Sequence, residues 1–306
     1  MALKKAGQRL AVLDLGTNTF HLLIAEQTTP TDFKELFRQR IFVKLGENGL
    51  DTIGEAPFQR GIEAVLFFRK LLVDYQVDRL MAFGTAALRT ASNGPLFVKE
   101  VQEKSGIKIQ LIDGDQEAKY IYLGVIQAVS FDECPKLIMD VGGGSVEFII
   151  ADQSGIRWAK SFPIGLSVLY NNFHHCNPIS TQEIERMHQF LDEKLQPLFV
   201  QLDHYPTRQL VGAAGTFDVL EQSESIKNKY PPTTPIPVQQ LRPIFSKIIR
   251  STLEERLQMA NLPTSRADMI VVAFSLMDYI IQRAHIQELI VSPAAMKEGI
   301  MREMLG

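Results

Sequence analysis

The chain has 306 residues, which is enough for two domains of ordinary size. Its hydrophobic fraction of 45% and charged fraction of 22% are typical of a folded globular protein, and they exclude a disordered, collagen-like or disulfide-stapled chain. The net charge of -3 leaves no basic excess for a nucleic acid polymer, and the apolar runs are too short to span a membrane.

Short apolar runs alternate with amphipathic stretches along the chain, and this alternation predicts an α/β architecture. Strands are expected at Arg9–Leu15, Phe20–Glu26, Arg79–Phe83, Ile107–Ile112, Lys136–Val141, Val146–Ala151, Gln209–Gly212 and Glu288–Ser292. Helices are expected at Phe58–Tyr75, after a capping box of Ser180 and Glu183, at Val238–Ala260 and at Arg266–Ala284. The proline-rich stretch at 230–237 predicts a connecting loop.

The two cysteines, Cys134 and Cys176, lie 42 residues apart without a CxxC motif. This spacing predicts reduced thiols in a cytoplasmic protein rather than a disulfide. His174 and His175 precede Cys176, but the cluster lacks a second half-site, so we expect no zinc there. The N-terminus has no apolar segment of the kind found in signal peptides.

Two segments resemble each other at a constant offset of 126 residues. They are LAVLDLGTNTFHLLIA from residue 10 and KLIMDVGGGSVEFIIA from residue 136. Each contains an apolar strand, an aspartate (Asp14 or Asp140), a turn of small residues and a second strand, which together predict a β-hairpin. Because the hairpin occurs twice, about one domain apart, we expect two related domains facing each other.

The two hairpin turns are candidate phosphate-binding sites, since successive backbone N–H groups in such turns form anion-binding concavities. Their residues are Gly16, Thr17, Asn18, Thr19, Gly142, Gly143, Gly144 and Ser145. An aspartate before each turn would repel phosphate unless a divalent cation lay between them, so Asp14 and Asp140 indicate Mg²⁺. The alternative is a pair of ordinary hairpin turns with capping aspartates.

Two further glycine- or proline-containing segments resemble strand-to-helix connections. A helix that starts near Thr216, directly after Gly215, would offer its N–H groups to a phosphate or nucleotide. Ser292 is positioned to cap a helix whose first residue is Pro293. A plain turn or cap, without a ligand, is the alternative at both places.

Charged residues near predicted strand ends are candidates for catalysis. Glu117 could polarise a water molecule for attack on phosphorus, while Asp113 and Asp115 could simply complement a helix dipole. Arg89 follows a strand and a short turn, and near a phosphate it could pair with two oxygens at once. A lone arginine is otherwise an ordinary surface residue.

Six motifs occur in the order and spacing of the exopolyphosphatase/guanosine pentaphosphate phosphohydrolase family, which the chain therefore resembles over nearly its whole length. They are AVLDLGTNTFHLLIAE, FGTAALRTASNG, IDGDQEAKYIYLGV, IMDVGGGSVEFII, VGAAGTFDVL and IVSPAAMKEGI. The resemblance implies two ribonuclease-H-like domains of the actin-like ATPase fold, facing each other across a cleft. We expect residues 1–124 in the first, with a C-terminal helix 293–306 packing back on it, and 125–292 in the second.

The resemblance also implies roles for individual residues. Glu117 would be the general base for the lytic water, and Arg89 would contact phosphate. Asp140 and Glu147 would lie near Mg²⁺, with Asp14 in the equivalent position of the first hairpin. Gly215 and Thr216 match a phosphate-binding motif. The chain departs from the family at His21, Val146 and Ala214, where arginine, threonine and glycine are usual.

The activity implied by the resemblance is Mg²⁺-dependent hydrolysis of the terminal phosphate of inorganic polyphosphate. The alternatives are guanosine pentaphosphate 5′-phosphohydrolase, a sugar-kinase-like phosphotransferase and a non-catalytic nucleotide or polyphosphate sensor. The expected partners are the polyphosphate or guanosine pentaphosphate substrate, with neither a nucleic acid polymer nor a membrane. A homodimer is compatible with the resemblance.

Overall fold

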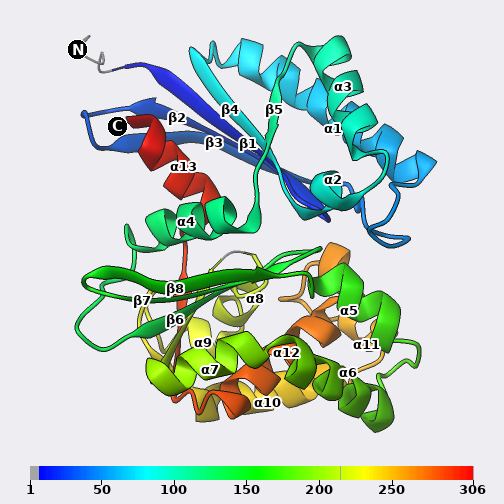
Figure 1. Cartoon of the computed structure of the whole chain (residues 1–306), viewed down its shortest axis with the longest axis vertical. Coiled ribbons are helices and arrows are strands. Elements are labelled where there is room, and N and C mark those ends of the chain that lie inside the picture. The colour runs from blue at the N-terminus through cyan, green and yellow to red at the C-terminus, as the bar shows by residue number, and fades with distance from the viewer. Residues whose placement is uncertain (1–6, 214, 306) are drawn as a thin grey trace. The chain divides into compact units, whose positions relative to one another are not determined.

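The computed structural model describes residues 7–213 and 215–305, so Ala214 lies outside the described residues. The contacts divide the chain into two compact units (Figure 1). Unit 1 comprises Met1–Gly124, Gly142–Gly144 and Met296–Gly306, and unit 2 comprises Val125–Val141 and Ser145–Ala295. Gly142–Gly144, at the tip of the second hairpin, therefore group with unit 1. The division expected from the sequence placed these three residues in the second domain.

Unit 1 is built on a five-stranded sheet with the order β3-β2-β1-β4-β5. The strands are β1 (Arg9–Leu15), β2 (Thr19–Gln27), β3 (Phe33–Phe42), β4 (Arg79–Gly84) and β5 (Ile109–Leu111). Strands β1, β2 and β3 pair antiparallel, whereas β4 and β5 continue from β1 in parallel. The helices are α1 (Glu55–Asp74), α2 (Ala86–Thr90), α3 (Gly94–Ser105), α4 (Gly114–Val125) and α13 (Met296–Leu305).

Helices cover both faces of the unit 1 sheet (Figure 1). Apolar side chains of β1, β2, α1 and α3 form the core on one face; among them are Leu13, Leu22 and Phe68. On the other face, α13 packs against β1. A Cβ on Gly299 would lie 1.9 Å from the carbonyl oxygen of Tyr120, so this glycine allows α13 to approach α4 closely.

The C-terminal helix begins at Met296, and the start expected at residue 293 is wrong. The hydroxyl of Ser292 donates to the carbonyl oxygen of Ala294 and accepts from its amide, at 2.6 and 3.3 Å. The side chain of Ser292 therefore stabilises a short turn of its own instead of capping the helix.

Unit 2 is built on a six-stranded sheet with the order β10-β11-β9-β6-β7-β8. The strands are β6 (Lys136–Val141), β7 (Val146–Asp152), β8 (Gly155–Phe162), β9 (Gln209–Ala213), β10 (Ile236–Pro237) and β11 (Glu288–Ser292). The helices are α5 (Leu166–Phe173), α6 (Thr181–Lys194), α7 (Gln196–His204), α8 (Asp218–Glu221), α9 (Glu224–Lys227), α10 (Val238–Arg250), α11 (Leu253–Leu257) and α12 (Ile270–Arg283). A 3₁₀ turn covers Thr264–Arg266.

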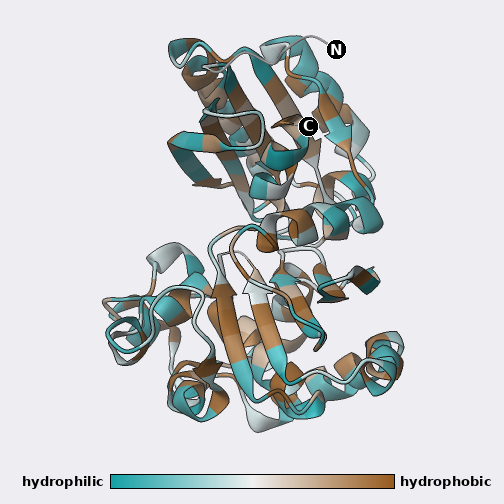
Figure 2. Ribbon diagram, turned by 90° about the vertical axis from the view of Figure 1, so that its left-hand side faces the viewer, coloured by the Kyte–Doolittle hydropathy of each residue, from teal (hydrophilic) through white to brown (hydrophobic). Residues whose placement is uncertain are grey.

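The core of unit 2 lies against its central strands, which are mostly apolar and brown in Figure 2. Nearly every residue of α12 is buried, which makes this helix the main apolar support of the sheet. Ser180 begins α6 through the expected capping box with Glu183. In the part of the chain that the structure describes, no helix combines the length and apolarity needed to cross a bilayer.

Three helix boundaries in unit 2 differ from those expected. The helix predicted over Val238–Ala260 ends at Arg250, because Thr252 starts a separate helix through a capping box with Glu255. The helix predicted from Arg266 begins only at Ile270. The helix predicted near Thr216 begins at Asp218 and has only four residues, which is too short for a helix N-terminus to form a phosphate site.

Candidate functional site

The two hairpins that resemble each other in sequence have the same register. In unit 1, Asp14 lies opposite His21, and in unit 2 Asp140 lies opposite Glu147. The pairing of each hairpin's second strand with the following strand shifts register after an isoleucine, at Ile24 and at Ile150, again 126 residues apart. The extra residue lies on β3 in unit 1 and on β8 in unit 2. The structure therefore confirms the repeated hairpin.

The first turn is closed by its own backbone and packed against neighbours in unit 1. The amide of Gly16 donates to the carbonyl oxygen of Thr19 at 3.1 Å. The buried hydroxyl of Thr17 accepts from the amide of Ala87 at 3.3 Å, and a Cβ on Gly144 would lie 2.7 Å from that same oxygen. Thr17 thus connects the start of α2 to the glycine turn, and Gly144 must lack a side chain to fit there.

Glu117 and Arg89 meet in unit 1. Glu117 lies in the first turn of α4 and is 8% exposed, and its Oε2 lies 3.7 Å from Nη1 of Arg89. The same guanidinium also donates to the carbonyl oxygen of Ile112, which fixes its position next to α4. Asp113 accepts from the amide of Gln116 at 2.8 Å and so caps the start of α4.

Asp14 lies at the carboxyl end of β1, on the sheet face that α13 covers. Burial raises its pKa to about 6, the positive charge of Lys297 opposes this rise, and the negative charge of Glu298 adds to it. Glu298 is itself held by Arg38 of β3 at 2.8 Å. Helix α13 thus brings both signs of charge to the end of β1.

In unit 2, the cross-strand pair of Asp140 and Glu147 places two carboxylates side by side on one face of the sheet. Glu147 is 1% exposed, and the hydroxyl of Ser161 on β8 donates to its Oε1 at 2.6 Å. Carboxylate oxygens are the ligands that the hard cation Mg²⁺ takes, so this pair could hold one. No group of three or more His, Cys, Asp or Glu side chains arranged for a metal occurs within the described ranges.

Gly215 and Thr216 follow β9 in unit 2 and have a charged neighbour that our sequence-based assignment did not include. A Cβ on Gly215 would lie 2.3 Å from Nη2 of Arg266, so the guanidinium is packed against this glycine. The segment of Arg266 is held by Arg256, which is wholly buried and donates to the carbonyl oxygens of Ala267 and Ser251. Within the SRADMI stretch at 265–270, no local feature of the sequence separates Arg266 from a surface arginine.

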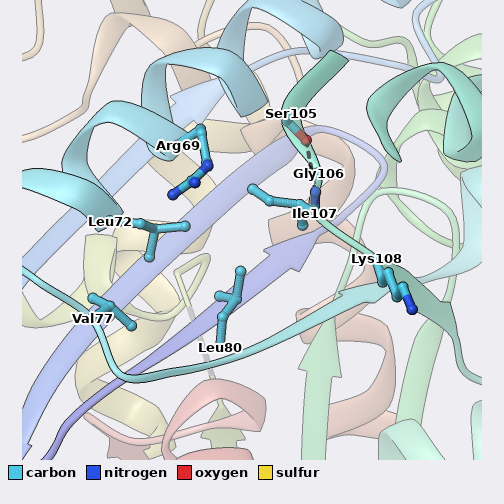
Figure 3. A pocket seen from close by; sticks show the side chains of 8 residues that line it. All are labelled: Arg69, Leu72, Val77, Leu80, Ser105, Gly106, Ile107 and Lys108. Carbon is cyan, nitrogen blue, oxygen red and sulfur yellow. Dashed lines mark hydrogen bonds between the residues drawn. The ribbon is translucent and has the colours of Figure 1, made fainter. Parts of the chain in front are cut away.

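A cavity of about 370 Å³ lies elsewhere in unit 1 (Figure 3). Its lining consists of Arg69, Leu72, Val77, Leu80, Ser105, Gly106, Ile107 and Lys108. It opens at the amino end of β4, whereas Arg89 and Glu117 follow the carboxyl ends of β4 and β5. The Ser105 hydroxyl is already bonded to Val101 and Ile107, so the lining offers a ligand little beyond two exposed basic side chains.

The Ppx/GppA phosphatase family matches residues 23–306. A solved exopolyphosphatase from Cytophaga hutchinsonii is 34% identical, with a TM-score of 0.92 over 97% of this chain and 98% of that one. A Haemophilus influenzae protein provisionally named an exopolyphosphatase is 27% identical over 96% of this chain and 90% of its own length. The guanosine-5′-triphosphate,3′-diphosphate pyrophosphatase of Photobacterium profundum is 24% identical over 96% of this chain, which spans 59% of that relative.

Proposed function

Because the chain belongs to the Ppx/GppA phosphatase family, we propose that it removes the terminal phosphate of inorganic polyphosphate with Mg²⁺. It is a phosphoanhydride hydrolase with two domains of the actin-like, ribonuclease-H-like fold. The observation that carries the proposal is the buried Glu117 carboxylate held 3.7 Å from Arg89. A carboxylate in this position can accept a proton from water, and the adjacent guanidinium can contact the phosphate that the water attacks.

In the proposed reaction, Glu117 orients a water molecule and takes one of its protons. The water oxygen forms a bond to the terminal phosphorus, and the bond from that phosphorus to the bridging oxygen breaks. The bridging oxygen leaves with the shortened polymer, and orthophosphate is released. Such reactions depend mainly on positioning and on neutralising charge, to which the Gly16–Thr19 turn and Arg89, both in unit 1, would contribute.

Asp140 and Glu147 would hold the Mg²⁺, since their carboxylates lie on one face of neighbouring strands and Ser161 orients one of them. The metal would supply charge neutralisation for the phosphate oxygens. Asp14 is the matching residue of unit 1. Burial raises its pKa to about 6, so its ionised form would gain from a cation bound beside it.

The test is orthophosphate release from polyphosphate in the presence of Mg²⁺, compared with the Glu117→Gln variant. Glutamine keeps the size of the side chain but cannot accept the proton, so the rate is expected to fall at least about 100-fold. Asp115→Asn is the matched control, because Asp115 is an exposed carboxylate in the same helical turn. Equal rates in Glu117→Gln and wild-type protein would refute the assigned role of Glu117.

Hydrolysis of the 5′-terminal phosphate of guanosine pentaphosphate is the second candidate. It is favoured by the match to the Photobacterium profundum relative, whose name describes activity on that nucleotide. Both substrates end in a phosphoanhydride, so the same groups would act on either one. Measuring kcat/KM for the two substrates under the same conditions decides which is preferred.

A further inference from the structure

Three side chains form a row across neighbouring strands of unit 1. Asp14 on β1 lies opposite His21 on β2, which in turn lies opposite Arg40 on β3. Residues directly opposite each other in antiparallel strands point to the same face, with Cβ atoms about 5 Å apart. An acid, an imidazole and a guanidinium therefore line one face of the sheet, beginning at the carboxyl end of β1.

The equivalent row in unit 2 has a different chemistry. Asp140 lies opposite Glu147, and Glu147 lies opposite Ser161. This row holds two carboxylates and a hydroxyl, and the hydroxyl donates to Glu147. Two acids favour a cation, whereas the row in unit 1 has one acid beside two groups that can carry positive charge. The unit 1 row is therefore the one suited to an anion.

The guanidinium of Arg40 is directed along β3 toward the first turn. Its Cζ lies 5.8 Å from the ring centre of Phe42, and Phe42 pairs with Thr19, the last residue of the Gly16–Thr19 turn. An arginine leaning on an aromatic ring keeps its N–H groups available at the edge of the guanidinium plane. Arg40 is thus positioned beside the turn that is the candidate phosphate site of unit 1.

Arg38, two residues earlier on the same strand, differs from Arg40 because carboxylates neutralise its charge. It pairs with Glu35 at 2.6 Å and with Glu298 at 2.8 Å, and these carboxylates raise its pKa against the opposing effect of burial. Arg40 is exposed, and no ion pair joins it to a carboxylate among the residues that the structure describes. Its charge is available to a ligand.

We propose that Arg40 binds a phosphate group of the polyphosphate substrate, next to the group held by the Gly16–Thr19 turn. This assignment rests on the proposed function, and it adds a binding residue on β3 for the part of the chain that follows the terminal phosphate. Because the contact would be made equally before and during the reaction, Arg40 contributes to KM rather than to kcat.

The experiment measures steady-state orthophosphate release from polyphosphate for Arg40→Gln, Arg40→Lys and the control Lys34→Gln. Lys34 is an exposed cation of the same strand, opposite Glu26 and far from the turn. We expect Arg40→Gln to raise KM about tenfold with kcat within about twofold, which is the usual size of one charge-assisted contact. Arg40→Lys should recover most of the affinity, and Lys34→Gln should match the wild-type protein.

A second measurement keeps the inference testable if the protein turns over no polyphosphate. Binding of sodium tripolyphosphate in the presence of Mg²⁺ is followed by calorimetry in the Glu117→Gln background, with and without Arg40→Gln. A Kd about tenfold weaker with Arg40→Gln supports the assignment independently of catalysis. An unchanged Kd, or the same loss with Lys34→Gln, would show that Arg40 only packs on Phe42 or acts as general surface charge, and would overturn it.

Discussion

The β1–β2 hairpin of unit 1 and the β6–β7 hairpin of unit 2 share a backbone but not a chemistry. Their strand registers, and the point at which each second strand shifts register against the next strand, coincide at an offset of 126 residues. At the position after the turn that faces the aspartate, however, unit 1 has His21 and unit 2 has Glu147. The comparison shows that turn geometry and apolar strand residues preserve the hairpin, while the polar side chains opposite the aspartates decide which charge it attracts.

The largest effect should come from removing an acid of the unit 2 hairpin. Glu147→Gln is expected to lower orthophosphate release at least about 100-fold and to raise the Mg²⁺ concentration needed for half-maximal rate, because one of the two unit 2 carboxylates proposed to hold Mg²⁺ is lost. His21→Gln, the matched change in unit 1, should cost less than about tenfold and leave the Mg²⁺ requirement unchanged. Equal Mg²⁺ responses in the two variants would contradict the difference between the hairpins.

The next largest effect should be a loss of stability when an arginine that donates to backbone carbonyl oxygens is removed, and each unit has one such arginine. Arg256 of unit 2 is fully buried, and Arg256→Met should lower the free energy of unfolding by about 3 kcal/mol because the carbonyl oxygens of Ser251 and Ala267 lose their donors. Arg60 of unit 1 donates to Val43 but is partly exposed, so Arg60→Met should cost only about 1 kcal/mol. Urea unfolding of both variants checks the ranking, and a larger loss for Arg60→Met would refute burial as its cause.

The stability of unit 2 should depend on pH through Glu183, which lies at the start of α6. Burial disfavours the charge of Glu183, but hydrogen bonds from Ser180, His175 and Cys176 outweigh it and lower the pKa to about 2, from an ordinary value of 4.5. Because the folded state lowers this pKa, its stabilisation of about 3 kcal/mol is complete above pH 4.5 and is lost as the pH falls toward 2.

Urea unfolding of wild-type protein and Glu183→Gln at pH 7 and near pH 2.5 measures this contribution. We expect a clear difference in unfolding free energy at pH 7 that shrinks at the lower pH, where the carboxyl group becomes protonated in the unfolded chain. A difference that stays constant across this range would mean that the charge of Glu183 is not what stabilises the start of α6.

The sequence allowed the central strands to be predicted closely, because their apolar runs are short and bounded by charge or glycine. Strands β1, β6 and β11 have the expected limits. Strands β3 and β8 were not predicted, since they lie beside the central hairpins and mix exposed charged residues with half-buried apolar ones. Such strands lack the continuous apolar pattern on which the prediction depends.

Candidate site residues could be selected from the sequence where each one lies within a recognisable motif. Glu117 and Arg89 are close together, as their expected common role requires, although they belong to different segments. Arg266 was not included because nothing local in SRADMI distinguishes it from a surface arginine, and only the fold places it against Gly215. Arg40 could not be assigned from the sequence either, because its place opposite His21 depends on the register of β3, a strand that was not predicted.

Hydrolysis of polyphosphate in water enriched in ¹⁸O tests the central claim most directly, with the products analysed by mass spectrometry. If water attacks the terminal phosphorus, each released orthophosphate carries one labelled oxygen from the solvent and the shortened polymer carries none. Label in the polymer, or transfer of phosphate to an added alcohol in place of its release, would contradict terminal hydrolysis and favour a different reaction on the same fold.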